Sequence, residues 1–145
     1  MAQWSFELED DGSHILSLKI LPPRLGDECG LSSDIAREAF SQLGAYFGGR
    51  LRNFNLPLRM IGTDFQMSVW NALRAIPFGE TVSYSQLAAM VSRPRACRAA
   101  AAACGANPIP IIVPCHRVIA ADGSIGGFSS GLRLKRFLLG IEAGG

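Results

Sequence analysis

A cysteine and a histidine stand side by side in the segment IIVPCHRVIA, residues 111–120, between two apolar runs that read as buried strand. A thiol next to an imidazole, here Cys115 and His116, can act as a nucleophile, because the imidazole can accept the thiol proton directly or through a water molecule. The same pair could instead be inert core or supply metal ligands. A lone cysteine is most often inert, so the rest of the chain has to decide.

A carboxylate on the far side of the imidazole would orient it and stabilise its charged form. After residue 80 the chain has two acidic residues, Asp122 and Glu142, and Glu142 ends the last apolar segment, from where it could fold back onto the pair. A metal site is less well supported, because His14 and His116 are the only histidines and no Cys/His pair has zinc-ligand spacing. We therefore expect no metal and no cofactor.

The composition predicts a packed protein of one domain, or one domain with a small appendage. Of the 145 residues, 48% are hydrophobic and 18% are charged, which argues against disorder. No apolar run reaches the roughly 18 residues that span a bilayer, and the first ten residues do not resemble a signal peptide. The four cysteines form no CxxC pair. We expect reduced thiols in a cytoplasmic protein, or a nuclear one in a eukaryote.

The net charge of +2 is unevenly distributed along the chain. Residues 1–62 contain six Lys/Arg and eight Asp/Glu, whereas residues 63–145 contain eight and four. A basic C-terminal part suits contact with phosphates. Ordinary variation of surface charge explains the difference equally well.

The N-terminal part predicts a hairpin and one helix. Residues 3–23 alternate apolar and polar about the turn DDGS, which is typical of a β-hairpin, and residues 22–33 read as loop. A helix follows over 32–49, with Ser32 or Ser33 as its cap, glycines 48 and 49 as its end, and a predicted apolar face of Ala36, Phe40, Leu43 and Phe47. Residues 50–62 read as an extended connector, and we place the boundary between domains 1–60 and 61–145 there.

The C-terminal part opens with two capping boxes, in which a Ser or Thr is followed three residues later by Gln. Thr63 and Gln66 predict one helix, and Ser83 and Gln86 a second, short one. A third helix is expected over 95–107 after the link SRP, with Pro94 at its first position, so that two short helices form a helix-turn-helix. Strand and loop follow over 108–131, and a last helix over 132–142 has the predicted inner face Leu134, Phe137, Leu138 and Ile141.

The third of these helices, RACRAAAAACGAN, is poor in side chains that read base edges in the major groove. Only Arg95 and Arg98 are long and charged, and the alanines would let the helix approach another surface closely. Such a helix could enter a narrow groove with an arginine projecting into the base stack, which serves a protein that extrudes a base regardless of sequence. A tightly packed core helix is the alternative, although it leaves the arginines unexplained.

Four segments of the chain together resemble a known family. These are GETVSYSQLA (79–88), RPRACRA (93–99), NPIPIIVPCHRVI (107–119) and GGFSSGLRLKRFLLGIE (126–142), and they resemble the O6-alkylguanine-DNA alkyltransferases, also called methylated-DNA–protein-cysteine methyltransferases. The resemblance is dense from Thr63 to Glu142. It implies an α/β (α+β) fold with a small N-terminal part and a mainly helical C-terminal DNA-binding and alkyl-acceptor domain, whose helix-turn-helix is of the winged-helix type.

The resemblance also implies an activity, the repair of alkylated DNA by a single-turnover enzyme. The protein would bind double-stranded DNA in the minor groove, flip out an O6-alkylguanine and transfer the alkyl group irreversibly to its own cysteine. Cys115 would be the acceptor, His116 a base acting through water, and Glu142 the group that orients the imidazole. Tyr84 would donate a proton to the departing guanine, and Asn107 would brace the turn before the acceptor.

Other positions are implied as binding residues. Arg98 would fill the gap left by the flipped nucleotide, and the remaining DNA contacts would come from Tyr84, Arg95, Ala99 and Ala102. The pocket for the alkylguanine would be formed by Pro110, Val118, Phe128 and Ser129. Phe128 stands where the family often has a tyrosine, and the zinc that some members carry has no ligand set here. We expect a monomer that does not contact membranes.

Three other functions have to be weighed. An alkyltransferase-like protein would recognise alkylguanine without transferring the alkyl group, but such proteins have another residue in place of the cysteine. A sequence-specific regulator would need more base-reading side chains on the alanine-rich helix. A cysteine hydrolase is the third, and directly adjacent cysteine and histidine rarely place thiol and imidazole well for acyl transfer.

Overall fold

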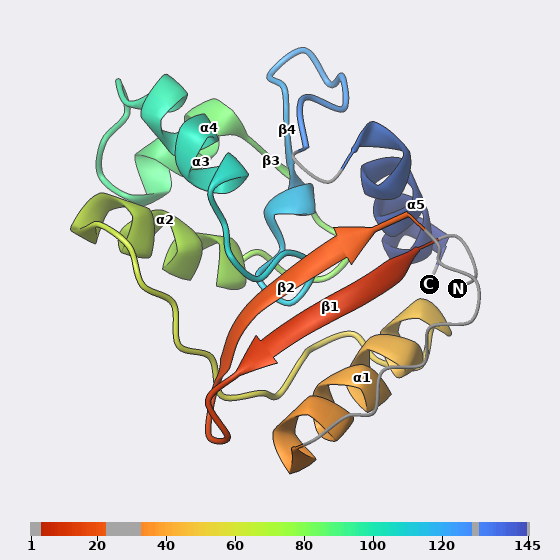
Figure 1. Ribbon diagram of the computed structural model, residues 1–145. Helices are drawn as coiled ribbons and strands as arrows, with labels where there is room; N and C mark the ends of the chain where they lie inside the picture. Colours follow the sequence, from red (N-terminus) through yellow and green to blue (C-terminus); the bar gives the residue numbers. More distant parts are fainter. Residues whose placement is uncertain (1–3, 23–32, 129–130, 145) are drawn as a thin grey trace. The chain divides into compact units, whose positions relative to one another are not determined.

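The computed structural model describes residues 4–22, 33–128 and 131–144 (Figure 1). The chain divides into two compact units, residues 1–60 and residues 61–145. The first contains a two-stranded sheet and helix α1, and the second contains helices α2 to α5 and a short pair of strands. This mixed α/β architecture confirms the predicted fold class.

In the first unit, β1 (Ser5–Asp10) and β2 (Ile15–Leu21) form the predicted antiparallel hairpin. The turn between them is held by Asp11, whose carboxylate accepts hydrogen bonds from the backbone N–H groups of Ser13 and His14 at 2.8 and 2.7 Å. The connector after α1 adds to this hairpin. Its Leu58 forms a parallel bridge with Ile15, so the predicted extended segment pairs with β2.

Helix α1 (Asp34–Phe47) begins at Ser33, whose hydroxyl accepts a hydrogen bond from the N–H of Ala36. The predicted apolar face was partly wrong, because the buried residues are Ala36, Ala39, Leu43 and Tyr46. Tyr46 is fully buried against the ring of Phe54, 5.4 Å away between centroids. Phe47 packs against Phe6 of β1 instead. The buried face of α1 thus depends on aromatic contacts of Tyr46 and Phe47 with rings outside the helix.

In the second unit, both capping boxes are present as predicted. Thr63 and Gln66 cap α2 (Asp64–Arg74), and Ser83 and Gln86 cap α3 (Tyr84–Met90), each pair by two reciprocal hydrogen bonds. The short strand β3 (Val82–Ser83) pairs in parallel with β4 (Val118–Ile119). This pairing fixes the start of α3 beside the segment that follows Cys115.

Helix α4 (Cys97–Gly105) starts later than predicted, and Pro94 is not its first residue. Pro94 lies in a turn, because the link from α3 runs over residues 91–96 and is closed by backbone hydrogen bonds from Arg93 to Ala88 and from Ala96 to Arg93. The buried face of α4 is Ala100, Ala103 and Cys104. The indole Nε1 of Trp70 in α2 donates a 2.9 Å hydrogen bond to the carbonyl oxygen of Ala103.

The apolar segment around Cys115 is not the buried strand that its composition indicated. Only Val118–Ile119 is strand, and Cys115–Arg117 form one turn of 3-10 helix. Helix α5 (Leu132–Gly144) ends the chain as predicted, but its buried residues are Leu134, Lys135, Leu138 and Glu142, whereas Phe137 and Ile141 are only partly buried. Two charged side chains of this helix therefore lie in the core.

Among the residues that the structure describes, no helix is long and apolar enough to cross a membrane. The same residues contain no group of three or more His, Cys, Asp or Glu side chains placed to hold a metal ion.

The Trp70 hydrogen bond predicts a measurable contribution to the position of α4. We expect Trp70→Phe to lower the free energy of unfolding by about 1 kcal/mol, because the ring still packs but a buried hydrogen bond is lost. Urea denaturation of the full chain measures this. Ser85→Ala, at an exposed position of α3, should change the stability little, and equal effects of both variants would contradict the assignment.

Candidate active site

Cys115 is presented by a braced turn between α4 and the 3-10 helix. The side-chain amide of Asn107 donates to the carbonyl oxygen of Val113 at 2.8 Å, and its oxygen accepts from the N–H of Ile109 at 2.9 Å. The Cys115 N–H in turn donates to the same Val113 oxygen. Ile111, within this turn, has a φ of +73°, which is strained for a β-branched residue and requires such bracing.

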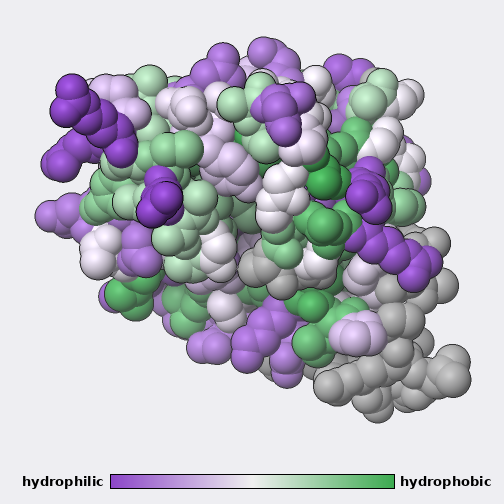
Figure 2. All heavy atoms as spheres, turned by 90° about the horizontal axis from the view of Figure 1, so that it is seen from above, coloured by the Kyte–Doolittle hydropathy of each residue, from purple (hydrophilic) through white to green (hydrophobic). Residues whose placement is uncertain are grey.

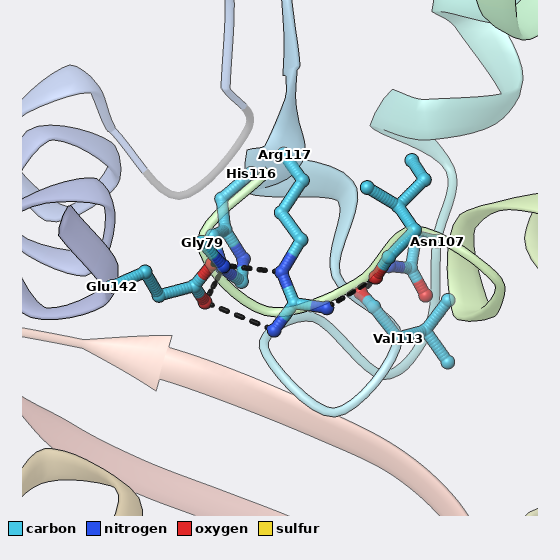
Figure 3. A network of polar contacts seen from close by, with 7 residues as sticks. Gly79, Asn107, Val113, His116, Arg117 and Glu142 are labelled. Carbon is cyan, nitrogen blue, oxygen red and sulfur yellow. Dashed lines mark hydrogen bonds and ion pairs between the residues drawn. The ribbon is translucent and has the colours of Figure 1, made fainter. Parts of the chain in front are cut away.

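The imidazole next to Cys115 belongs to a buried polar network, shown in Figure 3. His116 Nε2 lies 2.6 Å from Oε2 of Glu142. Arg117 donates from Nε to Oε1 of the same carboxylate at 2.8 Å and from Nη2 to Oε2 at 3.1 Å. Its Nη1 donates to the carbonyl oxygen of Ile76 at 2.6 Å. The carboxylate of α5 thus holds both side chains that follow the cysteine.

The electrostatics of this network favour an uncharged imidazole. Burial lowers the pKa of His116 below its ordinary value, and the hydrogen bond to Glu142 only partly opposes this. Arg117 supplies the positive charge that compensates Glu142, as a two-point ion pair taken out of water requires. A neutral imidazole can accept a proton.

The thiol of Cys115 is also uncharged at rest. Burial raises its pKa, while the Asn107 side chain and the ammonium group of Lys135 act in the opposite direction. Lys135 is fully buried, and its Nζ donates to the carbonyl oxygens of Val118 at 2.6 Å and Gly127 at 3.0 Å. The Asn107 side chain and the Lys135 ammonium group therefore reduce the free-energy cost of forming a thiolate at Cys115.

Lys135 and Arg117 were missed as site residues by the sequence reasoning. For Lys135 a signal was available. Residues 135, 138 and 142 follow one another at spacings of three and four, so Lys135 lies on the same face of α5 as Glu142. No comparable spacing marks Arg117, whose role depends on a carboxylate 25 residues away.

A cavity of about 500 Å³ reaches Cys115. Its lining comes from the start of α3, the end of α4 and the loop before α5: Tyr84, Ala101, Cys104, Gly105, Cys115, Gly127 and Phe128. The Tyr84 hydroxyl donates to the Gly127 carbonyl oxygen at 3.4 Å, and burial raises the pKa of this hydroxyl. The cavity therefore combines two thiols, a protonated phenol and otherwise apolar walls.

The other residues that the resemblance assigned to a pocket are not all on this cavity. Phe128 lines it, whereas Pro110 and Val118 are buried and do not border it. Instead, the carbonyl oxygen of Val118 accepts a hydrogen bond from Lys135, and Pro110 forms a β-bridge with Val113 in the braced turn. Ser129 lies outside the described residues.

Four of the five residues assigned to DNA contact are exposed on α4 or just before it. Arg98, Ala99 and Ala102 are exposed on α4, and Arg95 is exposed just before it. The opposite side of α4 is buried against its neighbours, and Tyr84 is partly buried at the cavity. Figure 2 views the molecule from above the orientation of Figure 1, and hydrophilic side chains stand out there around paler and more hydrophobic ones.

Comparisons with known proteins agree with this arrangement. Residues 64–144 match the family model described as 6-O-methylguanine DNA methyltransferase, DNA binding domain. A methylated-DNA–protein-cysteine methyltransferase of Methanosarcina barkeri is 55% identical over 106 residues, which is 73% of this chain and 67% of that protein. The enzyme of the same name from Methanosarcina mazei is 44% identical over an alignment of 150 positions, which covers 89% of this chain and 95% of the relative.

The fold is similar to solved structures of the same kind. The crystal structure of Mycobacterium tuberculosis OGT in complex with DNA superposes with a TM-score of 0.85 at 41% identity, over 96% of this chain and 86% of that one. The family model covers more than half of the chain, and both relatives exceed 40% identity over more than two thirds of it. The chain belongs to the 6-O-methylguanine DNA methyltransferase family.

Proposed function

We propose that this protein repairs double-stranded DNA by moving the alkyl group of an O6-alkylguanine irreversibly onto its own Cys115. The observation that carries the proposal is the position of this thiol. It lines an apolar cavity large enough for a base and adjoins an imidazole held by a buried carboxylate. Residues 61–145 contain all of these groups and form the DNA-binding and alkyl-acceptor part.

The transfer is a displacement at an sp³ carbon. The Cys115 proton passes to His116 through a water molecule, and the thiolate sulfur forms a bond to the alkyl carbon while the bond from that carbon to O6 breaks. The electron pair goes to guanine, which leaves once it gains a proton or a hydrogen bond. Tyr84 fits this last role by donating a hydrogen bond, because it lines the cavity and burial raises its pKa, so that the hydroxyl stays protonated.

The buried surroundings suit a thiolate that forms only for the reaction. Thiol and imidazole are both neutral at rest, since burial raises the pKa of Cys115 and lowers that of His116. When the proton moves, Glu142 stabilises the new imidazolium. Lys135 and Asn107 favour the sulfur anion. A thiolate in such a cavity is poorly hydrated and so reacts readily with an apolar alkyl carbon.

The exposed surface of α4 fits a duplex. Ala99 and Ala102 allow close approach to a groove, and Arg98 is long enough to enter the space that a flipped nucleotide leaves. Arg95 and the positive charge of this part of the chain favour contact with phosphates. The cavity borders the same helix through Ala101 and Gly105, so a base leaving the stack has a short path to Cys115.

The product is a thioether, in which sulfur is a poor leaving group. Each chain therefore acts once, on one damaged base. Asn107 holds the acceptor in place through the turn, and Pro110 and Val118 shape the backbone around it.

The first test is stoichiometric transfer. When the protein is mixed with a duplex containing one O6-methylguanine, we expect the peptide with Cys115 to gain one methyl group and the reaction to stop at one per chain. Mass spectrometry of intact protein and peptides measures both. Cys115→Ser should bind the duplex without any gain in mass. Tight binding by the unaltered chain without mass change would instead identify a recognition protein of the alkyltransferase-like kind.

The second test concerns base extrusion. We expect Arg98→Ala to slow methyl transfer from a duplex roughly tenfold, which corresponds to losing about 1.4 kcal/mol of contact energy. Transfer from a single-stranded oligonucleotide should change much less, because no base has to leave a stack. Arg74→Ala, at an exposed arginine of α2, is the control. An equal loss on both substrates would show that Arg98 does not assist extrusion.

The third test concerns the protonation state of His116. Because burial lowers the pKa of His116 below 6.5, the imidazole stays able to accept a proton as the pH falls through that value. We expect the single-turnover rate to stay constant there and to decline only at more acidic pH, with DNA binding measured in parallel. His14→Gln, which changes the other histidine, should give the same profile. A half-maximal rate at or above pH 6.5 would contradict this role.

A further inference from the structure

The cavity that reaches Cys115 is bordered by a second thiol, that of Cys104. Cys104 belongs to the last turn of α4, Cys115 begins the 3-10 helix, and both cysteines are free thiols. The alkyl transfer proposed above uses only one of the two. The other α4 residues on the cavity wall, Ala101 and Gly105, are small. No bulky side chain of α4 therefore stands next to Cys104 on this wall.

The backbone ties both cysteines to the same turn. The carbonyl oxygen of Cys104 accepts a hydrogen bond from the N–H of Asn107 at 3.3 Å. The side chain of Asn107 donates to the carbonyl oxygen of Val113 at 2.8 Å, and the N–H of Cys115 donates to that same oxygen at 2.8 Å. A disulfide needs its two Cβ atoms about 4 Å apart. One asparagine thus links the backbones of two cysteines whose side chains reach one cavity.

The two thiols differ in how readily they ionise. Burial raises the pKa of both, and that of Cys104 to about 12. Lys135 favours the anion of either cysteine, whereas the side chain of Asn107 favours that of Cys115. Peroxides react with a thiolate and not with a thiol. A peroxide that enters the cavity therefore oxidises Cys115 first, while Cys104 remains a protonated thiol on the same wall.

We propose that Cys104 is a resolving cysteine, which joins Cys115 in a reversible disulfide when hydrogen peroxide oxidises Cys115. In the first step the Cys115 sulfur bonds to one peroxide oxygen while the O–O bond breaks, which gives a sulfenic acid and water. In the second step the Cys104 sulfur bonds to the Cys115 sulfur while the S–O bond breaks, and the hydroxide that leaves takes the Cys104 proton. Two thiols are oxidised to one disulfide, and the peroxide is reduced to two water molecules.

The resolving thiol protects Cys115 from irreversible loss. A sulfenic acid without a thiol partner is oxidised further to sulfinic and sulfonic acids, which thiols do not reduce. A disulfide, in contrast, is returned to two thiols by exchange with a reductant. This inference concerns the chemistry of the two thiols alone, and it does not depend on the alkyl transfer proposed above.

The experiment treats the full chain with hydrogen peroxide in the absence of other thiols, and then with dithiothreitol. Mass spectrometry of unreduced peptides should find the peptides of Cys104 and Cys115 joined, at a mass lower by two hydrogen atoms. Dithiothreitol should restore both thiols. In Cys104→Ala we expect no joined peptide, and Cys115 should accumulate as sulfinic and sulfonic acids that dithiothreitol does not reduce.

Cys97→Ala is the matched control, because it makes the same change in the same helix at a cysteine that does not line the cavity. Cys97 lies seven residues before Cys104, about 10 Å along the helix axis, which is too far for a disulfide between them. This variant should form the link between Cys104 and Cys115 as the unaltered chain does. Circular dichroism before oxidation shows that each variant is folded.

Two results would overturn the inference. In the first, the unaltered chain forms no link, and its Cys115 is converted to sulfinic and sulfonic acids as fast as in Cys104→Ala. In the second, the peptide of Cys115 is joined to a cysteine other than Cys104. Both results are read from peptide masses, so they leave the test of alkyl transfer unaffected.

Discussion

The C-terminal part of this protein depends on one buried carboxylate. Glu142 accepts two hydrogen bonds from Arg117 and contacts His116 at 2.6 Å. Arg117 also donates to the carbonyl oxygen of Ile76, just after α2. A charge removed from water is tolerated only when paired, and loss of one partner leaves the other buried and uncompensated. The same interaction therefore joins α5, the 3-10 turn and the end of α2, and it fixes the imidazole next to the acceptor thiol.

A second buried charge completes the site from the other direction. Lys135 donates to the carbonyl oxygens of Val118 and Gly127, and so links α5 to β4 and to the loop that borders the cavity. Its position seven residues before Glu142 places both on one side of the helix. One helix, α5, thus supplies an anionic side chain that contacts the imidazole of His116 and a cationic side chain that favours the thiolate of Cys115.

Features encoded by short-range chemistry could be predicted from the sequence. The hairpin follows from alternation about an Asp-Gly turn, and the starts of α2 and α3 from capping boxes, because these signals lie within three or four residues. Features decided by distant contacts could not. The burial of Tyr46 depends on Phe54, the delayed start of α4 on a turn closed by Ala88, and the 3-10 turn at Cys115 on the Asn107 brace. The motif indicated Cys115, His116, Glu142 and Asn107 as candidate site residues, but not Arg117, which pairs with Glu142, or Lys135, which favours the thiolate.

The two cysteines of the cavity show that residue type alone does not decide chemistry. Cys104 and Cys115 border the same space, and burial raises the pKa of both. Cys115 also has the Asn107 side chain and Lys135 to favour its anion, and His116 follows it directly in the sequence. For Cys104, burial outweighs the favourable influence of Lys135, and a thiolate at Cys115 would oppose the ionisation of Cys104 as well. Once Cys115 begins to lose its proton, that charge disfavours the second thiolate further, so the cavity supports one nucleophile at a time and keeps the other thiol as part of its wall.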